Sequence, residues 1–157
     1  METLLIHLGI SMPLIPHYPA LQPFALALLA LFLKTSLTSI AQVLSRYRSG
    51  RFLLPEDAAL VGRQTVASES TLVQRVSYVW RNDLENLPLF LLLALTYVLL
   101  GAPRDSATWL FASYVVIRYL HTLIYLRGLQ PWRTVLYLSG LALCWLIGIA
   151  ILLKIFV

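Results

Sequence analysis

Residues 132–153 read WRTVLYLSGLALCWLIGIAILL, and after Arg133 this stretch contains no charged side chain. A helix needs about 20 mainly apolar residues to cross the hydrocarbon core of a bilayer. The length and apolarity of this stretch therefore indicate a transmembrane α-helix. It decides the fold class, because a chain in lipid must satisfy its backbone hydrogen bonds within helices or a closed barrel.

Three earlier stretches have the same character, namely residues 23–43, 82–100 and 106–126. The second of them ends at Gly101-Ala102-Pro103, which is a helix-stop signal. The sequence thus predicts an all-α integral membrane protein, a four-helix bundle forming one transmembrane domain over residues 1–157.

The composition excludes an ordinary soluble domain. Of the 157 residues, 59% are hydrophobic and only 12% are charged, whereas soluble domains carry roughly 25% charged residues. The net charge of +5 raises the question of nucleic acid. The aromatic residues sit in apolar runs, however, and no RNA- or DNA-binding motif occurs among the arginines, so we expect no nucleic-acid partner. The single cysteine, Cys144, predicts neither a disulfide framework nor a metal site.

A lead-in precedes the first apolar stretch, and a long polar connection joins the first stretch to the second. Residues 1–22 lack the basic start and cleavage site of a secretory signal, so we expect an irregular lead-in from which nothing is removed. The longest connection, residues 44–81, has no Pro or Gly after Ser70. Its second half is therefore expected to extend the second helix beyond the bilayer.

The basic residues divide between the two sides of the predicted bundle. One side carries only Arg104 and Lys154. The other side carries eight arginines: Arg46, Arg48, Arg51, Arg63, Arg75, Arg81, Arg127 and Arg133. By the positive-inside rule the eight-arginine side is cytoplasmic, which puts the 44–81 loop in the cytoplasm and both termini on the opposite face.

Several polar and charged residues lie within the predicted spans, where contact with lipid is unfavourable for them. A charge at mid-membrane costs at least about 2.5 kcal/mol on insertion scales, so each one needs a reason. Arg118, His121, Thr122 and Tyr125 follow at spacings that put them on one face of a helix. The other three helices also have a polar side, made of Lys34, Thr38 and Gln42, of Arg81, Asn82, Asp83 and Glu85, and of Arg133, Thr134 and Tyr137. Together these sides predict a charged pocket between the helices, opening to the cytoplasm.

The same residues also have a purely structural interpretation. Arg81, Arg127 and Arg133 would then anchor helix ends at the headgroups, and Glu85 would pair with Arg81 one turn away. Arg118 and His121 would join neighbouring helices.

The functional interpretation asks which ligand fits such a pocket. Arginine forks bind carboxylates, and a carboxylate such as Glu85 binds an ammonium. A guanidinium beside a thiol favours the reactive thiolate. Glutathione carries two carboxylates, an ammonium and a thiol, and the bilayer beside the pocket would admit an apolar second substrate. Transport is a rival interpretation of the same pocket.

The chain resembles the membrane-associated proteins in eicosanoid and glutathione metabolism. Three stretches carry the resemblance: Pro55-Glu56-Asp57-Ala58, Arg81 through Asn86, and Arg118 through Tyr125 continuing to Pro131-Trp132-Arg133-Thr134 and Tyr137. It implies a homotrimer of four-helix protomers, with glutathione bound between subunits near the cytoplasmic face.

The resemblance also implies roles for single residues. Arg133 would hold and activate the thiolate, Thr134 would lie beside the sulfur, and Asp57 would pair with Arg133. Arg46 would reach a glutathione carboxylate across the subunit boundary. The peptide would be bound by Arg81, Asn82, Glu85, His121, Tyr125 and Tyr137. Arg118 faces the same pocket and is counted among the binding residues; it is also the next candidate after Arg133 for activating the thiol. Lys34 matches a lysine of the prostaglandin-synthase branch.

The chain lies between two branches of this family. Thr134 replaces a serine of the prostaglandin-synthase branch, while the glutathione-transferase branch is apolar there. Leu84-Glu85-Asn86 is closer to the transferase branch, and the match at Arg46 depends on a gap in the first loop. The resemblance therefore does not fix the lipophilic substrate.

Three functions follow as hypotheses. The leading one is a glutathione-dependent membrane enzyme that conjugates lipophilic electrophiles or reduces lipid hydroperoxides. The alternative is a prostaglandin-endoperoxide isomerase of the prostaglandin E synthase type. The third is a transporter or scaffold without catalysis. Transporters often have inverted repeats or helices broken by Gly or Pro near mid-membrane. Here no repeat is evident, and the candidate breaks within the spans are limited to Pro88, Gly140 and Gly148, which argues against transport.

Overall fold

The computed structural model describes residues 17–156, so most of the lead-in expected at residues 1–22 lies outside the described residues. It contains four long helices, α2 (Leu21–Ser49), α4 (Thr71–Leu99), α5 (Arg104–Arg127) and α6 (Trp132–Phe156), and a short one, α3 (Pro55–Leu60). Each long helix is long and apolar enough to cross a membrane. The all-α fold class is confirmed, and the chain is an integral multi-pass membrane protein.

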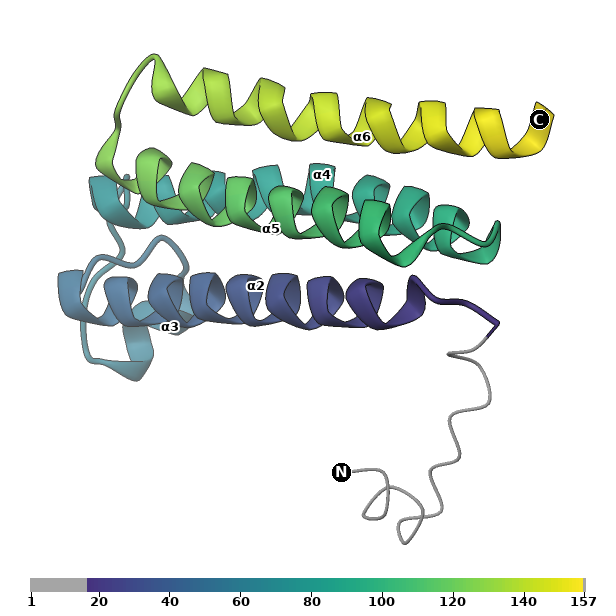
Figure 1. Cartoon of the computed structure of the whole chain (residues 1–157). Coiled ribbons are helices and arrows are strands. Elements are labelled where there is room, and N and C mark those ends of the chain that lie inside the picture. The colour runs from purple at the N-terminus through teal and green to yellow at the C-terminus, as the bar shows by residue number, and fades with distance from the viewer. Residues whose placement is uncertain (1–16, 157) are drawn as a thin grey trace, which may run out of the picture.

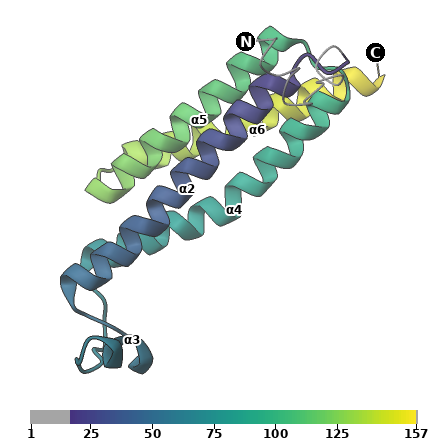
Figure 2. The same ribbon diagram turned by 90° about the horizontal axis from the view of Figure 1, so that it is seen from below.

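The helices are arranged in three layers. α4 and α5 lie in the middle, α2 packs on both from one side, and α6 packs on both from the other (Figure 1). Within the described residues α2 and α6 do not contact each other. The short α3 projects beyond the bundle, past the C-terminal end of α2 (Figure 2). We call the end with α3 and the α5–α6 turn the loop end, and the other the far end.

The helix ends follow local signals in the sequence. α2 continues past residue 43, because no breaker occurs before Gly50, whose φ of 59° ends the helix and whose N–H donates to the Arg46 carbonyl. α4 begins where the sequence predicted, with the Ser70 side chain accepting a hydrogen bond from the Val73 N–H. The short helix α3 was not predicted; it has Pro55 at its start and two carboxylates in its first turn.

The core lies between the middle layer and its neighbours. The Phe90 and Tyr114 rings stack, with centroids 3.7 Å apart and an interplanar angle of 4°. Phe111 and Phe90 form a T-shaped pair, at a centroid distance of 5.9 Å. By contrast Phe32 is 67% exposed and Trp145 is 68% exposed. Large apolar side chains on the outside fit a surface that faces lipid or other subunits.

Candidate functional site

Three charged side chains meet in the interior of the bundle and join three helices. Asp83 on α4 binds Lys34 on α2, with Nζ and Oδ2 2.5 Å apart. Its other oxygen accepts from the Arg118 guanidinium on α5 at 2.8 Å. Each of these side chains is only 2% exposed. We call Lys34, Asp83 and Arg118 the ionic triad.

The ionic triad explains part of the polar pattern found in the sequence. Lys34 is the buried charge of the first span, and further along its face Gln42 donates to the Ser77 hydroxyl of α4 at 2.8 Å. Arg118 also donates to the Asn82 side chain at 2.6 Å. Its guanidinium is thus held by two groups of α4, while its Nε has no partner among the described residues.

Six of the predicted site residues line one cavity near the loop end, between α4, α5 and α6. The cavity has a volume of about 220 Å³ and is lined by Asn82, His121, Tyr125, Arg133, Thr134 and Tyr137. We call it the arginine cavity. The sequence placed these residues on three different helices, and the packing of the helices brings them together.

Arg133 is the cation of this cavity, and neutral groups surround it. Its guanidinium carbon lies 4.7 Å from the centroid of the Tyr125 ring. Within residues 17–156, the ion pairs are Lys34–Asp83, Arg118–Asp83 and Arg46–Glu69, so Arg133 has no carboxylate partner there. A guanidinium without a carboxylate keeps its charge available for an anion.

His121 is the most enclosed member of the arginine cavity. Its side chain is buried and its ring meets Tyr125 edge-on, with centroids 5.7 Å apart. Its Nδ1 atom is buried without a hydrogen-bond partner among the described residues. Because buried polar atoms are normally paired, this nitrogen is suited to a ligand that enters the cavity.

A second cavity of about 320 Å³ adjoins the first and shares Tyr125 and Arg133 with it. We call it the outer cavity; its other lining residues are Thr71, Gln74, Arg75, Tyr78 and Gly128. Arg75 donates to the Leu126 carbonyl at 3.0 Å, which ties α4 to the end of α5. The sequence analysis did not select these residues, although Arg75, Tyr78 and Asn82 recur at helical spacing.

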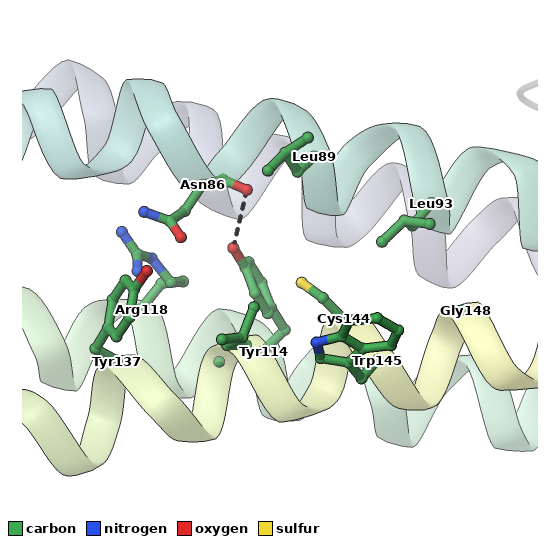
Figure 3. Close-up of a pocket in the computed structure, with 11 residues that line it drawn as sticks. Asn86, Leu89, Leu93, Tyr114, Arg118, Tyr137, Cys144, Trp145 and Gly148 are labelled. Carbon is green, nitrogen blue, oxygen red and sulfur yellow. Dashed lines mark hydrogen bonds between the residues drawn. The ribbon is translucent and has the colours of Figure 1, made fainter.

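A third cavity, the apolar pocket, extends toward mid-bundle and has a volume of about 370 Å³. Figure 3 shows Arg118 and Tyr137 at one end of the pocket and Leu93 and Gly148 at the other. Tyr137 lines both this pocket and the arginine cavity. The Tyr114 hydroxyl donates to the Asn86 carbonyl at 3.3 Å, the dashed line of Figure 3. Polar groups at one end and apolar walls at the other suit an amphiphile.

Cys144, the single cysteine, lies on the wall of the apolar pocket and is half-buried. No group of His, Cys, Asp and Glu side chains in the described part of the chain is arranged to hold a metal ion.

The remaining predicted site residues lie elsewhere in the single chain. Arg46 and Asp57 line a pocket of about 230 Å³ beside α3, where Arg46 Nε binds Glu69 Oε1 at 2.6 Å. Asp57 therefore lines a different pocket from Arg133. Arg81 and Glu85 are exposed on α4, and no ion pair joins them in the described structure. Arg127, the predicted headgroup anchor, is exposed as well.

Comparisons of the sequence with known proteins show which proteins the chain is similar to. The model of the MAPEG family matches residues 24–153. Prostaglandin E synthase of Homo sapiens is 34% identical over 126 residues, covering 79% of this chain and 82% of that protein. Microsomal glutathione S-transferase 1 of Bos taurus is 34% identical over 112 residues, covering 68% of this chain and 72% of that protein.

Proposed function

The chain belongs to the MAPEG family and is a membrane enzyme, and we propose that it binds glutathione and activates the thiolate for attack on lipophilic substrates. One relative is named a glutathione transferase and the other a prostaglandin E synthase. The family resemblance read from the sequence is thereby confirmed.

The observation that carries the proposal is the state of Arg133. Its guanidinium borders two adjoining cavities, rests on the Tyr125 ring and has no carboxylate partner among the described residues. A free thiol has a pKa of about 8.5, so only a few per cent is thiolate at neutral pH. A nearby guanidinium stabilises the thiolate and raises that fraction. Thr134 adds a hydroxyl beside the same position.

The rest of the glutathione would occupy the arginine and outer cavities. Asn82, His121, Tyr125 and Tyr137 supply neutral donors and acceptors, and the unpaired Nδ1 of His121 would gain a partner. Glu85 would accept the ammonium and Arg81 a carboxylate, both from the exposed face of α4. Arg118, fixed in the ionic triad, would contribute its positive potential from the apolar-pocket side.

The lipophilic substrate would lie in the apolar pocket, because that pocket meets the arginine cavity at Tyr137. With an electrophile, the thiolate sulfur forms a bond to carbon and a leaving group departs with the electron pair. With a hydroperoxide, sulfur attacks the terminal oxygen and the O–O bond breaks, giving an alcohol and a glutathione sulfenic acid. A second glutathione converts that acid into the disulfide and water.

A prostaglandin-endoperoxide isomerase is the second candidate. Human prostaglandin E synthase covers 79% of the chain, and Thr134 places a hydroxyl next to Arg133 as the serine does in that branch. In this reaction the thiolate attacks one peroxide oxygen, the O–O bond breaks, and the other oxygen leaves as an alkoxide that takes a proton. The C–H proton next to the sulfur-bound oxygen then leaves, a carbonyl forms, and the S–O bond breaks to release the thiolate. Product analysis with an endoperoxide substrate separates the isomerase from the peroxidase.

We also propose a homotrimer whose glutathione site is completed by a neighbour. In one chain Arg46 and Asp57 lie in a different pocket from Arg133, so their predicted roles require a second subunit. The large exposed apolar surface of the helices leaves room for subunit contacts. Native mass spectrometry in detergent tests the proposal, since a monomer that turns over glutathione would refute it.

The proposed orientation puts the arginine cavity at the cytoplasmic face. The loop end carries Arg46, Arg75 and Arg133. At the far end, Arg104 donates to the Gln22 side chain and Lys154 donates to the Gly101 carbonyl. This charge asymmetry supports a cytoplasmic loop end. Labelling of cysteines introduced beside Arg51 and Arg104 tests it; labelling of the Arg104 turn from the cytoplasm would reverse the orientation.

Calorimetry of glutathione binding to the detergent-purified protein tests the proposed function. We expect saturable binding to wild type and retained binding of S-methylglutathione, which has the same charged groups without an ionisable sulfur. Absence of binding to both ligands would refute a glutathione enzyme and favour the transporter or scaffold interpretation.

A further inference from the structure

Gln130 contacts both residues that the proposed function places at the glutathione sulfur. It stands just before α6 (Trp132–Phe156), in the turn that follows α5. The amide orientation that satisfies its neighbours turns its oxygen toward Arg133, where it accepts from Nε at 3.1 Å and from NH2 at 2.8 Å. In that orientation its nitrogen donates to the Thr134 hydroxyl oxygen at 3.2 Å. The orientation of an amide is assigned from such a network.

We propose that Gln130 is a positioning residue that holds the Arg133 guanidinium and the Thr134 hydroxyl as donors to one anion, an inference that rests on the proposed function. Gln130 is not among the residues named for the family resemblance, although it directly precedes Pro131.

The first part of the argument concerns charge. Gln130 occupies the Nε–NH2 edge of the guanidinium, and NH1 has no hydrogen-bond partner among residues 17–156. An amide oxygen fixes the plane of the guanidinium and carries no net charge. A carboxylate at the same place would form an ion pair with Arg133 and weaken its pull on the thiolate. Glutamine therefore orients the cation and leaves its charge for the ligand.

The second part concerns the hydroxyl. A threonine hydroxyl has one proton to donate and lone pairs that accept. When the Gln130 amide donates to Thr134, the hydroxyl accepts there and its proton is free for another acceptor. The same amide thus makes Thr134 a donor to the sulfur. Because both contacts depend on one side chain, the effects of Gln130 and Thr134 should be coupled.

The test uses the isosteric charge change Gln130→Glu in the full-length, detergent-purified protein. The apparent pKa of bound glutathione is read from thiolate absorbance against pH. We expect Gln130→Glu to raise that pKa by about one unit, which is a roughly threefold loss of thiolate at neutral pH when the wild-type thiol pKa lies about two units below its free value, with a matching loss of kcat for an aryl halide. Binding of S-methylglutathione should change only a few-fold, because that ligand has no thiolate to lose. Gln64→Glu adds the same charge at an exposed residue of the first loop and should leave the thiolate pKa unchanged.

A second variant tests the hydroxyl part. Gln130→Ala keeps the full charge of Arg133 and should lower kcat less than Gln130→Glu does. Thr134→Val should then have a smaller effect in the Gln130→Ala background than in wild type. Additive effects would contradict the coupling.

The possible failures are distinguishable. If wild type forms the thiolate and Gln130→Glu titrates like wild type, the proposed function stands and the role of Gln130 is wrong. If wild type forms no thiolate at neutral pH, the proposed function fails and the role of Gln130 falls with it. Equal losses of glutathione and S-methylglutathione binding in Gln130→Glu would mean general disruption and would also overturn the positioning role.

Discussion

The Arg133 guanidinium carbon lies 4.7 Å from the centroid of the Tyr125 ring, so the cation of the candidate site rests on an aromatic face. Such a contact contributes about 0.5–2 kcal/mol and orients the guanidinium without neutralising it. Tyr125 and Arg133 also line both the arginine cavity and the outer cavity. A ligand that spans both cavities would therefore pass this pair of side chains.

The ionic triad is expected to contribute stability through Asp83. The Asp83→Asn change leaves two buried cations without their shared carboxylate, and breaking a buried ion pair costs about 3–5 kcal/mol. We expect a large drop in the thermal unfolding temperature of the detergent-purified protein. Asp105→Asn, at an exposed residue of α5, is the control and should change little.

A second substitution checks the cause of that loss. Lys34→Met in the Asp83→Asn background removes one of the two stranded cations, so part of the lost stability should return. If the double variant is less stable than Asp83→Asn alone, charge imbalance is not the reason for the loss.

The apolar pocket is expected to select for the lipophilic substrate. A Cβ added at Gly148 meets no atom within 4 Å, so Gly148→Leu should fold and fill part of the pocket. We expect a roughly tenfold rise in KM for a long-chain hydroperoxide, equivalent to about 1.4 kcal/mol of lost contact, with glutathione affinity unchanged. Ala142→Leu adds the same side chain on α6 outside the pocket. An equal effect of the two changes would place the substrate elsewhere.

Much of the fold follows from the sequence alone. The lengths of the apolar stretches predict the four long helices. Ser70 marks the start of α4, because it is the last capping residue before an unbroken helical stretch. Apolar length does not give the helix ends outside the bilayer, so α2 runs to Ser49 instead of residue 43. The helix α3 is too short and too polar for a hydropathy signal, and only its Pro55 and acidic first turn indicate it.

The site was only partly predictable for a physical reason. Helical spacing identifies the face of a helix that carries Arg118 and His121, but it does not identify what lies opposite. Asp83 is 49 residues from Lys34 in the chain, and the two meet only because α2 packs on α4. Gln130 lies in a turn, where helical periodicity does not apply. Its position three residues before Arg133 was the signal in the sequence that could have indicated a contact between the two.

Glu85 is expected to bind the ammonium of glutathione. The Glu85→Gln change keeps the shape of the side chain and removes its charge, so we expect a loss of binding free energy of about 2 kcal/mol, typical of a hydrogen bond to a charged group. Calorimetry measures the loss directly. Arg127→Ala, at an exposed helix end, is the control and should leave binding nearly unchanged. Equal losses in both variants would mean that the site has been misplaced.

The central claim is that Arg133 activates the thiol of bound glutathione, and thiolate absorbance tests it most directly. Lowering the thiol pKa by about two units converts a few per cent of thiolate into most of the bound ligand. We predict a strong thiolate band for wild type at neutral pH, and loss of that band and of turnover in Arg133→Ala, with a smaller loss of glutathione affinity. An Arg133→Ala protein that binds glutathione, retains the thiolate band and reacts at the wild-type rate would contradict the claim.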